Sequence, residues 1–306
     1  MFKKILVPLD GSELAEWALT PALALAKATQ GEVILLRSMI PVYTTMPMVA
    51  DEYSWVWPDY AREQGRAETR TYLEDIARTH SHPSITLHPM AVEGDAAGMI
   101  VDTAVAEDID LIVMSTHGWS GFKKWLLGSV TERVLHSVSC PVLAVRSSQP
   151  IRRMLITLDG SPLAEKAVAP ALAVAAGLEA KVVLLHVNEP IIPGYESTFQ
   201  FEWSVAEDQQ QQLHHERQGQ AETYLNSVAH QYGRDDVEMQ QMVISGAPVE
   251  TILEFMRLHS MDLVAMSTHG RSGLRRWLYG SVTAKVMRGS ESHMLIVRPP
   301  NGELVS

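Results

Sequence analysis

The sequence has a single cysteine and no long uninterrupted apolar run. Cys140 has no second cysteine with which to form an intrachain disulfide, which fits a reducing compartment. No segment approaches the roughly 18 consecutive apolar residues of a transmembrane helix. The apolar run at the N-terminus stops at Pro8 and Asp10, too early for a signal peptide. We therefore expect a cytoplasmic protein without a membrane span, in which Cys140 is a small residue at the edge of the core.

The sequence also lacks an excess of positive charge. It has 25 Lys and Arg residues against 36 Asp and Glu, which gives a formal net charge of −11 at pH 7. An acidic surface disfavours non-specific binding to nucleic acid and to anionic lipid, so we expect neither as a partner. An anionic ligand would therefore have to be held by local backbone donors or by a few basic groups. The apolar share of 46% is ordinary for a globular protein.

The chain does contain an internal repeat. Lys3–Ser12 returns as Arg152–Ser161, with Leu-Asp-Gly-Ser at the end of both segments. Met114–Val134 returns as Met266–Val286, and 14 of these 21 positions are identical. Chance does not produce such agreement, so the chain is a tandem duplication. We place a first copy at residues 1–147 and a second copy at residues 151–300.

Short apolar segments alternate with helical segments in each copy. Ile5–Leu9 is an apolar run bounded by charge and by Asp-Gly, which is typical of a buried strand. Ser12 and Ser161 can cap the helices that follow, and Pro162 suits the first helical position. The order of elements, with short and uniformly apolar strands, predicts an α/β fold with a parallel sheet covered by helices on both faces. We expect further strands at 32–36, 86–92, 111–114, 142–145, 181–187 and 295–297, and helices at 67–79, 99–106, 130–138, 203–218 and 221–231.

A glycine-rich loop follows the fourth strand of each copy. In open α/β sheets, ligands bind beyond the carboxyl ends of the strands, where the strand order reverses. Ser115–Gly121 and its repeat Ser267–Gly273 lie at such an end, and glycines there let backbone N–H groups turn toward an anion. Some ten residues later, Gly-Ser-Val-Thr opens a helix, whose free N–H groups suit a phosphate. Neither the Walker A pattern nor the GxGxxG fingerprint is present, so this phosphate site would be built differently.

These loops resemble the nucleotide signature of the universal stress protein (UspA) family in its tandem, two-domain form. The family pattern is Gly-x2-Gly-x9-Gly-(Ser/Thr). Here it reads Ser115-x2-Gly118-x9-Gly128-Ser129, and again Ser267-x2-Gly270-x9-Gly280-Ser281. The spacing matches in both copies, and the resemblance covers nearly the whole chain. Serine replaces the first glycine in both copies, at a point where the backbone passes close to the ligand.

The resemblance implies two tandem doubly wound domains, each a five-stranded parallel sheet of the adenine nucleotide α-hydrolase type. It also implies an ATP site, with Mg²⁺ as a candidate ion, in which the loop and Gly-Ser-Val-Thr hold the phosphates and the ends of the first two strands frame the adenine. Carried over to this sequence, the nucleotide-binding residues are Pro8, Leu9, Asp10, Ser38, Ser115, Thr116, His117, Gly118, Gly121, Gly128, Ser129, Val130 and Thr131 in the first copy, and Thr157, Leu158, Asp159, Val187, Ser267, Thr268, His269, Gly270, Gly273, Gly280, Ser281, Val282 and Thr283 in the second.

The residues of the predicted nucleotide site give little indication of catalysis. His117 and His269 have no carboxylate or second histidine spaced to complete a metal site, so we interpret them as hydrogen-bonding loop residues. Asp10 and Asp159 could act as general bases, but the sequence shows no nucleophile–base pair. We expect at most weak ATP hydrolysis and assign no catalytic residue.

Two further regions are candidates for contacts. Residues 38–60 are unusually apolar for a loop and form either a lid over the nucleotide cleft or a protein-contact surface. The last strands of the two copies are apolar edges, and in this family the last strand pairs between domains. By that resemblance the two copies would pair within one chain, and a homodimer through other faces is plausible.

The leading hypothesis from the sequence is an ATP-binding stress-response protein that acts through nucleotide-dependent conformation and partner contacts. An alternative is an interaction scaffold that binds no nucleotide, motivated by the serines at positions 115 and 267. A further alternative is a slow ATPase.

Overall fold

The structure is a computed structural model that describes residues 2–39, 57–116, 128–189, 207–268 and 280–298. The first copy alternates strands and helices along the chain. Its elements are β1 (Lys4–Pro8), α1 (Glu13–Glu16), α2 (Leu19–Thr29), β2 (Glu32–Met39), α3 (Trp57–Thr79), β3 (Thr86–Glu93), α4 (Ala96–Ala106), β4 (Leu111–Ser115), α5 (Ser129–Ser137) and β5 (Val142–Val145).

The second copy repeats this order element by element. It contains β6 (Arg153–Leu158), α6 (Pro162–Glu165), α7 (Val168–Leu178), β7 (Lys181–Asn188), α8 (Glu207–Tyr232), β8 (Met239–Ser245), α9 (Pro248–Leu258), β9 (Leu263–Ser267), α10 (Ser281–Gly289) and β10 (His293–Val297).

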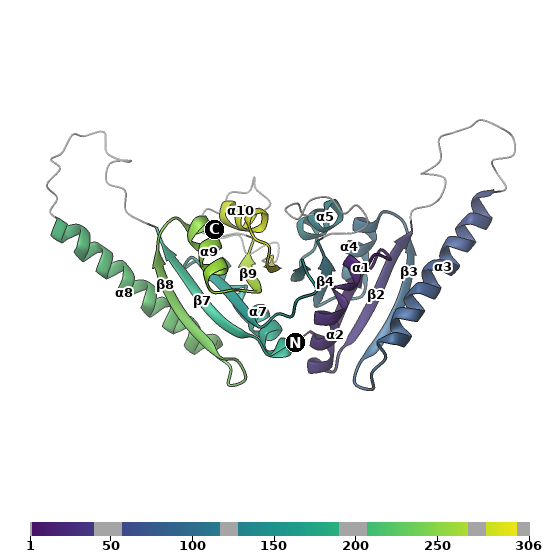
Figure 1. Ribbon diagram of the computed structural model, residues 1–306, viewed down its shortest axis with the longest axis horizontal. Helices are drawn as coiled ribbons and strands as arrows, with labels where there is room; N and C mark the ends of the chain where they lie inside the picture. The colour runs from purple at the N-terminus through teal and green to yellow at the C-terminus, as the bar shows by residue number, and fades with distance from the viewer. Residues whose placement is uncertain (1, 40–56, 117–127, 190–206, 269–279, 299–306) are drawn as a thin grey trace, which may run out of the picture.

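Across the described ranges, ten strands form one sheet in the order β3-β2-β1-β4-β5-β10-β9-β6-β7-β8. The five strands of each copy are parallel to one another, as the sequence predicted. The strand order reverses beside β1 and beside β6, so a ligand-binding crevice is expected between β1 and β4 and between β6 and β9. Figure 1 shows α5 and α10 on the same upper side of the molecule, with α3 and α8 at its two outer ends.

The sheet carries one hydrophobic core on each face. Neighbouring residues of a strand point to opposite faces, so Ile5 and Val7 join one core while Leu6 joins the other. The first core packs against α1, α2, α3 and their repeats, and the second against α4, α5 and their repeats. Each core contains residues of both copies, so the two copies share their interior.

Helix starts follow the sequence closely at the first helix of each copy. Ser12 and Ser161 are the N-caps of α1 and α6, and their Oγ atoms accept from the backbone N–H groups of Ala15 and Ala164 at 3.2 and 3.1 Å. Pro162 occupies the first turn of α6, where its missing N–H costs nothing.

The long outer helices differ from the sequence prediction. Helix α3 begins ten residues before the predicted 67–79, at Trp57. The two helices predicted at 203–218 and 221–231 form one continuous helix, α8. Gly219 lies inside α8, and one exposed helical glycine costs only about 1 kcal/mol relative to alanine, too little to end a helix of this length. Most of residues 38–60, predicted as a lid or contact surface, lie outside the described residues. Among the described helices, none is both long and apolar enough to cross a membrane.

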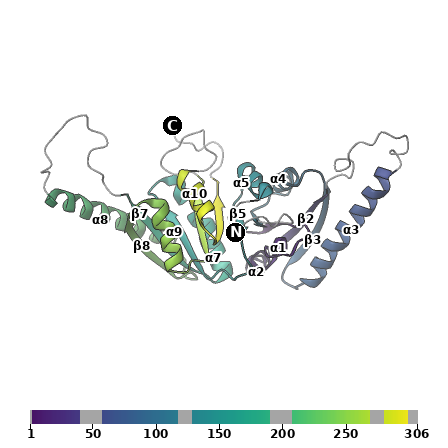
Figure 2. The ribbon, with the colours of Figure 1, turned by 45° about the horizontal axis from the view of Figure 1, so that its top comes forward.

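The two copies meet where β5 pairs antiparallel with β10. Leu143 lies opposite Leu295, and Ala144 opposite Met294. Helices α2 and α7 meet below this pair, near the centre in Figures 1 and 2. A Cβ on Gly177 of α7 would lie only 2.7 Å from the Leu25 side chain of α2. A larger residue at this position would therefore require the Leu25 side chain to move.

Two arginines cross this boundary in opposite directions. Arg146, directly after β5, donates through Nη2 to the Met287 carbonyl at 2.6 Å and through Nη1 to the Ser290 carbonyl, both at the end of α10. Its repeat, Arg298, donates through Nη1 to the His136 carbonyl at the end of α5. A cation that satisfies the last carbonyls of a helix stabilises its negative end. Each copy thus caps the helix that carries the Gly-Ser-Val-Thr segment of the other copy.

We expect the Leu143→Ala substitution to lower the free energy of unfolding by about 2–5 kcal/mol, because a fully buried leucine at the β5–β10 pair would leave a cavity. Chemical denaturation followed by circular dichroism measures this. Val105→Ala is the control, since Val105 is 71% exposed and its loss should change stability by no more than about 0.5 kcal/mol. Equal stability of the two variants would contradict a shared core at this pair.

We also expect the protein to lose stability as the pH falls below about 6.5, partly through His293. This side chain is 3% exposed; its Nδ1 accepts from the Arg146 backbone N–H at 3.1 Å, and its Nε2 lies 3.2 Å from the Gln149 carbonyl. Burial lowers the pKa of His293 below its usual 6.5, and the Arg146 cation acts in the same direction. The neutral form is therefore favoured in the folded state, and stability is lost as protons bind the unfolded chain more readily.

The His293→Gln variant should show a shallower decline in stability between about pH 7 and about pH 5. Equilibrium unfolding in urea at several pH values provides the measurement. His230→Gln, at the exposed end of α8, should keep the original slope. An unchanged slope in His293→Gln would show that protonation elsewhere, for example at His136, dominates the acid response.

Candidate functional site

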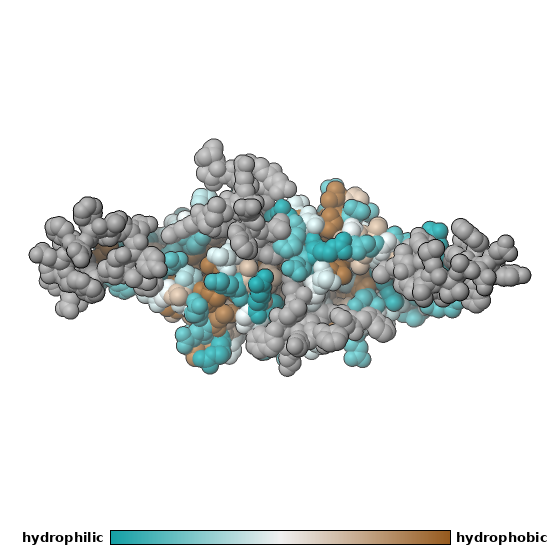
Figure 3. Space-filling view, turned by 90° about the horizontal axis from the view of Figure 1, so that it is seen from above, coloured by the Kyte–Doolittle hydropathy of each residue, from teal (hydrophilic) through white to brown (hydrophobic). Residues whose placement is uncertain are grey.

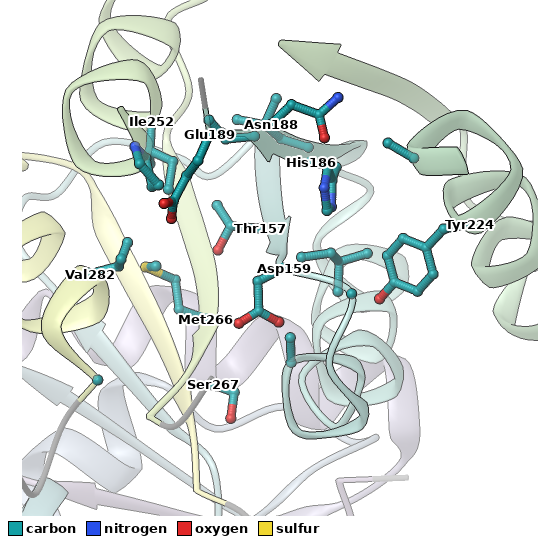
Figure 4. Close-up of a pocket in the computed structure, with 18 of the residues that line it drawn as sticks. Thr157, Asp159, His186, Asn188, Glu189, Tyr224, Ile252, Met266, Ser267 and Val282 are labelled. Atoms are coloured by element: carbon teal, nitrogen blue, oxygen red, sulfur yellow. The ribbon is translucent and has the colours of Figure 1, made fainter. Parts of the chain in front are cut away.

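The second copy contains a cavity of about 790 Å³ at the carboxyl ends of its strands. It lies at the reversal of strand order between β6 and β9, as expected for this class of sheet. In Figure 4, Asp159 occupies the middle of the cavity, with Tyr224 of α8 on one side and Met266 and Ser267 of β9 on the other. Val282 of α10 closes the far side.

The predicted aspartates organise the turn that follows the first strand of each copy. Asp10 Oδ1 accepts from the backbone N–H and the hydroxyl of Ser12 at 2.9 and 2.6 Å, and Asp159 Oδ1 accepts from the Ser161 N–H at 2.9 Å. Gly160, which separates the second pair, has a φ of +80°, in the region that favours glycine. One carboxylate oxygen is therefore committed to the turn, which fixes the direction in which the side chain enters the cleft.

The predicted Gly-Ser-Val-Thr segments open helices α5 and α10 without a side-chain cap. Gly128 and Gly280 are the N-caps, and as glycines they have no side chain with which to cap these helices. Ser129 and Ser281 are thus the first helical residues rather than caps. The first N–H groups of α10 face the cavity, since Gly280, Ser281, Val282 and Thr283 all line it. Free N–H groups at the positive end of a helix are a general anion-binding arrangement.

The threonine of each segment fastens the helix to the neighbouring strand. Thr131 Oγ1 donates to the Ser115 carbonyl at 3.1 Å, and Thr283 Oγ1 donates to the Ser267 carbonyl at 2.8 Å. Both hydroxyl hydrogens are used in these bonds, so a contact of Thr131 or Thr283 with a nucleotide would have to come from the backbone N–H or from the remaining lone pair. The Thr116 and Thr268 N–H groups are also engaged, with the carbonyls that end β5 and β10.

The serine that replaces the first signature glycine lies on the cavity floor in the second copy. Ser267 is 7% exposed, and its Oγ has no hydrogen-bond partner among the residues that the structure describes. A buried hydroxyl without a partner costs free energy, and a polar ligand group would satisfy it. The substitution of serine for glycine therefore adds a possible ligand contact and leaves the cavity open.

Some of the other predicted site residues line the cavity, and others lie outside the described residues. Thr157, Leu158 and Val187 line the cavity of the second copy. In the first copy, Ser38 is engaged through its hydroxyl with the Gly94 carbonyl at 2.6 Å. The predicted loop residues His117, Gly118, Gly121, His269, Gly270 and Gly273 lie outside the described residues.

Residues of β7 and α8 also line the cavity and were missed by sequence reasoning. His186 and Asn188 come from the end of β7, and Tyr224 and Arg217 come from α8. Burial raises the pKa of Tyr224, and the nearby Glu165 carboxylate acts in the same direction, so the phenol stays neutral. The available signal was the recurrence of Tyr-Leu at Tyr72 and Tyr224, which places a tyrosine at one position in both copies.

The polar groups around the cavity carry mixed charge. Asp159 and Glu189 are acidic, and Arg217 is basic. Seen from above, hydrophilic and hydrophobic residues alternate along this side of the molecule (Figure 3). Within the described ranges, no three His, Cys, Asp or Glu side chains form a cluster that could hold a metal ion. The cavity therefore offers a helix N-terminus and scattered polar groups to a ligand.

The single cysteine lies apart from this cavity. Cys140 packs at the edge of the core beside α4, and burial raises its pKa to about 11. The thiol form therefore dominates at neutral pH, and the thiolate is the reactive form. These observations agree with the structural role expected for this residue.

Comparison with known proteins agrees with the duplication and the fold. A model of the universal stress protein family matches residues 1–146 and again residues 150–298. Over 307 residues, the chain is 25% identical to a universal stress protein of Mycolicibacterium smegmatis, covering 96% of this chain and 97% of that one. The chain thus belongs to the universal stress protein family and contains its domain twice, which confirms the resemblance found in the sequence.

Shorter and structural relatives fit the same assignment. A universal stress protein of Methanocaldococcus jannaschii is 34% identical over 146 residues, covering 48% of this chain and 83% of that protein. The crystal structure of a universal stress protein from Archaeoglobus fulgidus superposes with a TM-score of 0.69 at 20% identity, covering 98% and 100% of the two chains. This last likeness supports the fold of two domains in one chain.

We expect Gly128→Ala to destabilise the protein by about 1–3 kcal/mol. The φ of Gly128 is −62°, which alanine adopts freely, but a Cβ there would lie 2.8 Å from the Thr116 carbonyl oxygen. The start of α5 would therefore have to move away from β4. Urea denaturation measures the stability, and hydrogen exchange of the α5 amides reports the local change.

Gly219→Ala is the matched control, because a Cβ at Gly219 meets nothing within 4 Å and alanine favours the helix by about 0.5–1 kcal/mol. The control should be slightly more stable than the parent protein. If both alanine variants were equally stable, the close contact between Gly128 and Thr116 would not govern the start of α5.

Proposed function

We propose that the protein binds ATP, together with Mg²⁺, and acts in a stress response through nucleotide-dependent conformation and contacts with partners. The observation that carries this proposal is the cavity at the strand reversal of the second copy, into which α10 directs an uncapped N-terminus. The family to which the chain belongs supplies the link to stress.

The cavity has the size and polarity of a nucleotide site. Its volume of about 790 Å³ lies within the range of about 300–1,000 Å³ that is usual for small-molecule sites. Phosphates would lie against the first turn of α10, where free N–H groups and the helix dipole favour negative charge. The base would lie toward the ends of β6 and β7, beside Leu158 and Val187.

ATP binding without fast hydrolysis is consistent with the hydrogen bond that engages the Asp159 carboxylate. Asp159 Oδ1 accepts from the Ser161 N–H, so one of its two carboxylate oxygens is occupied by the turn. General-base catalysis requires a positioned nucleophile as well as a base. Slow hydrolysis remains the alternative activity, and phosphate release at the rate of buffer blanks would exclude it.

The proposal also covers the domain boundaries, the pairing of the two copies and the location of the protein. The two copies occupy residues 1–147 and 151–300, work as an intramolecular pair, and act in the cytoplasm without nucleic acid or membrane as a partner. A homodimer through other faces belongs to the same proposal. A scaffold that binds no nucleotide is the competing function, and it predicts no heat of ATP binding.

Ser281→Pro should weaken ATP binding by about tenfold or more, since a lost charge-assisted hydrogen bond is worth about 1.5–3 kcal/mol. Proline at the first helical position removes one N–H donor while keeping the helix. Gly280 already has the extended ψ of 146° that a residue before proline prefers. Isothermal titration calorimetry with ATP and Mg²⁺ measures the affinity.

Ser281→Ala is the control, because it removes the hydroxyl and keeps the backbone N–H. It should bind ATP far better than Ser281→Pro, and both variants should unfold at temperatures close to that of the parent. No binding by the parent protein at millimolar ATP would refute the proposed function.

A further inference from the structure

The two copies differ at one position that lies beside the candidate site. The second strand of each copy contains two leucines followed by a residue that differs between the copies, Arg37 after Leu36 in the first copy and His186 after Leu185 in the second. Several neighbours of this position recur. Asp10 corresponds to Asp159, Glu16 to Glu165 and Tyr72 to Tyr224. An arginine and a histidine thus occupy the same place in otherwise similar surroundings.

In the second copy, this place opens onto the cavity. His186 and Tyr224 both line the cavity, and their rings meet edge to face with centroids 6.0 Å apart. Figure 4 shows the two side chains on the same side of Asp159. Gly160, from the turn after β6, lines the cavity as well. The space between this turn, the end of β7 and α8 therefore belongs to the cavity.

In the first copy, the guanidinium of Arg37 lies across the corresponding space. Its Cζ is 4.8 Å from the centre of the Tyr72 ring, a cation–π contact. On the other side, Nη2 approaches within 3.0 Å of the point where a Cβ of Gly11 would lie. Gly11 and Tyr72 are the counterparts of Gly160 and Tyr224, which line the cavity of the second copy. Arg37 therefore bridges two walls that the second copy leaves apart.

Charged groups surround the Tyr72 ring that Arg37 contacts. The Asp10 and Glu16 carboxylates both lie close enough to Tyr72 to affect its pKa, as does Arg37. The Tyr72 hydroxyl donates to Glu16 Oε1 at 2.9 Å, which fixes the ring under the guanidinium. The ring held in this way presents its face to the Arg37 cation.

We infer that Arg37 blocks the base end of the cleft in the first copy, so that ATP binds selectively to the second copy. The inference rests on the proposed function, because it assigns that function to one of the two sites. Arg37 does not lie at the phosphate end. It lies near the carboxyl end of β2, whereas the phosphate helix α5 comes after β4, two strands away in the sheet and about 10 Å distant at the usual strand spacing. The charge of Arg37 therefore offers little to the phosphates, while its side chain occupies the part of the cleft between Tyr72 and Gly11.

A reciprocal exchange tests this specificity residue. Arg37→His should open the first copy, and His186→Arg should close the second, with the double variant moving the site from one copy to the other. Calorimetry with ATP and Mg²⁺ gives the number of sites. Methionine methyl NMR identifies them, because Met266 lines the cavity of the second copy and Met114 is its counterpart in the first. Met114→Leu and Met266→Leu assign the two signals.

The parent protein should bind one equivalent of ATP and shift the Met266 signal alone. Arg37→His should bind a second equivalent and shift Met114 as well, and His186→Arg should bind about tenfold or more weakly at the second copy. Arg37→Gln is a further variant that removes the cation and shortens the side chain, and it should also open the first copy. Thermal unfolding confirms that each variant is folded.

Two results would overturn the inference while leaving the proposed function intact. One is binding of two equivalents by the parent protein, with both methionine signals shifted. The other is a parent protein that binds one equivalent together with a folded Arg37→His variant that gains no second site. Absence of any binding by the parent would refute the proposed function and the selectivity for the second copy, and Arg37→His would still decide whether Arg37 blocks the first copy. One equivalent gained at Met114 would support a blocking Arg37, and none would reject it.

Discussion

Pairing between β5 and β10 is the interaction on which the remaining architecture depends. It joins two five-stranded parallel sheets into one sheet and removes two apolar edges that would otherwise be open to other chains. It makes both hydrophobic cores continuous across the boundary. It also places Arg146 and Arg298 where each can cap the phosphate helix of the other copy. A disturbance of this pair would therefore reach both clefts.

The sheet was predictable because its strands are short, uniformly apolar and repeated. Leu111–Met114 is entirely apolar, as expected of a buried strand. Ser12 and Ser161 indicated the helix starts, because an N-cap depends on a local hydrogen bond that involves few other residues. The long outer helices were harder to predict. The first half of α8 is polar apart from Leu213 and contains Gly219, so an apolar pattern is present only in the second half, where the helix packs on the sheet.

The parts of the candidate site that belong to local sequence motifs could be predicted from the sequence. Asp159 comes directly after β6, the Gly-Ser-Val-Thr segment opens α10, and the structure places both at the cavity. His186 and Tyr224 reach it from different elements, and only the fold brings these two side chains to Asp159. For the same reason, the sequence shows Arg37 as one basic residue at the end of a strand. Its position between Tyr72 and Gly11 depends on how α3 packs, which no local pattern determines.

The covalent joint after Arg146 has a consequence for how such a protein can change over time. In a dimer of identical chains, every substitution alters both clefts at once. A substitution that improves ligand binding in one cleft therefore changes the other cleft in the same way. Here one codon encodes Arg37 and a different codon encodes His186. Selection can therefore act on each cleft separately, while the shared β5–β10 pair keeps the two copies in a fixed one-to-one ratio.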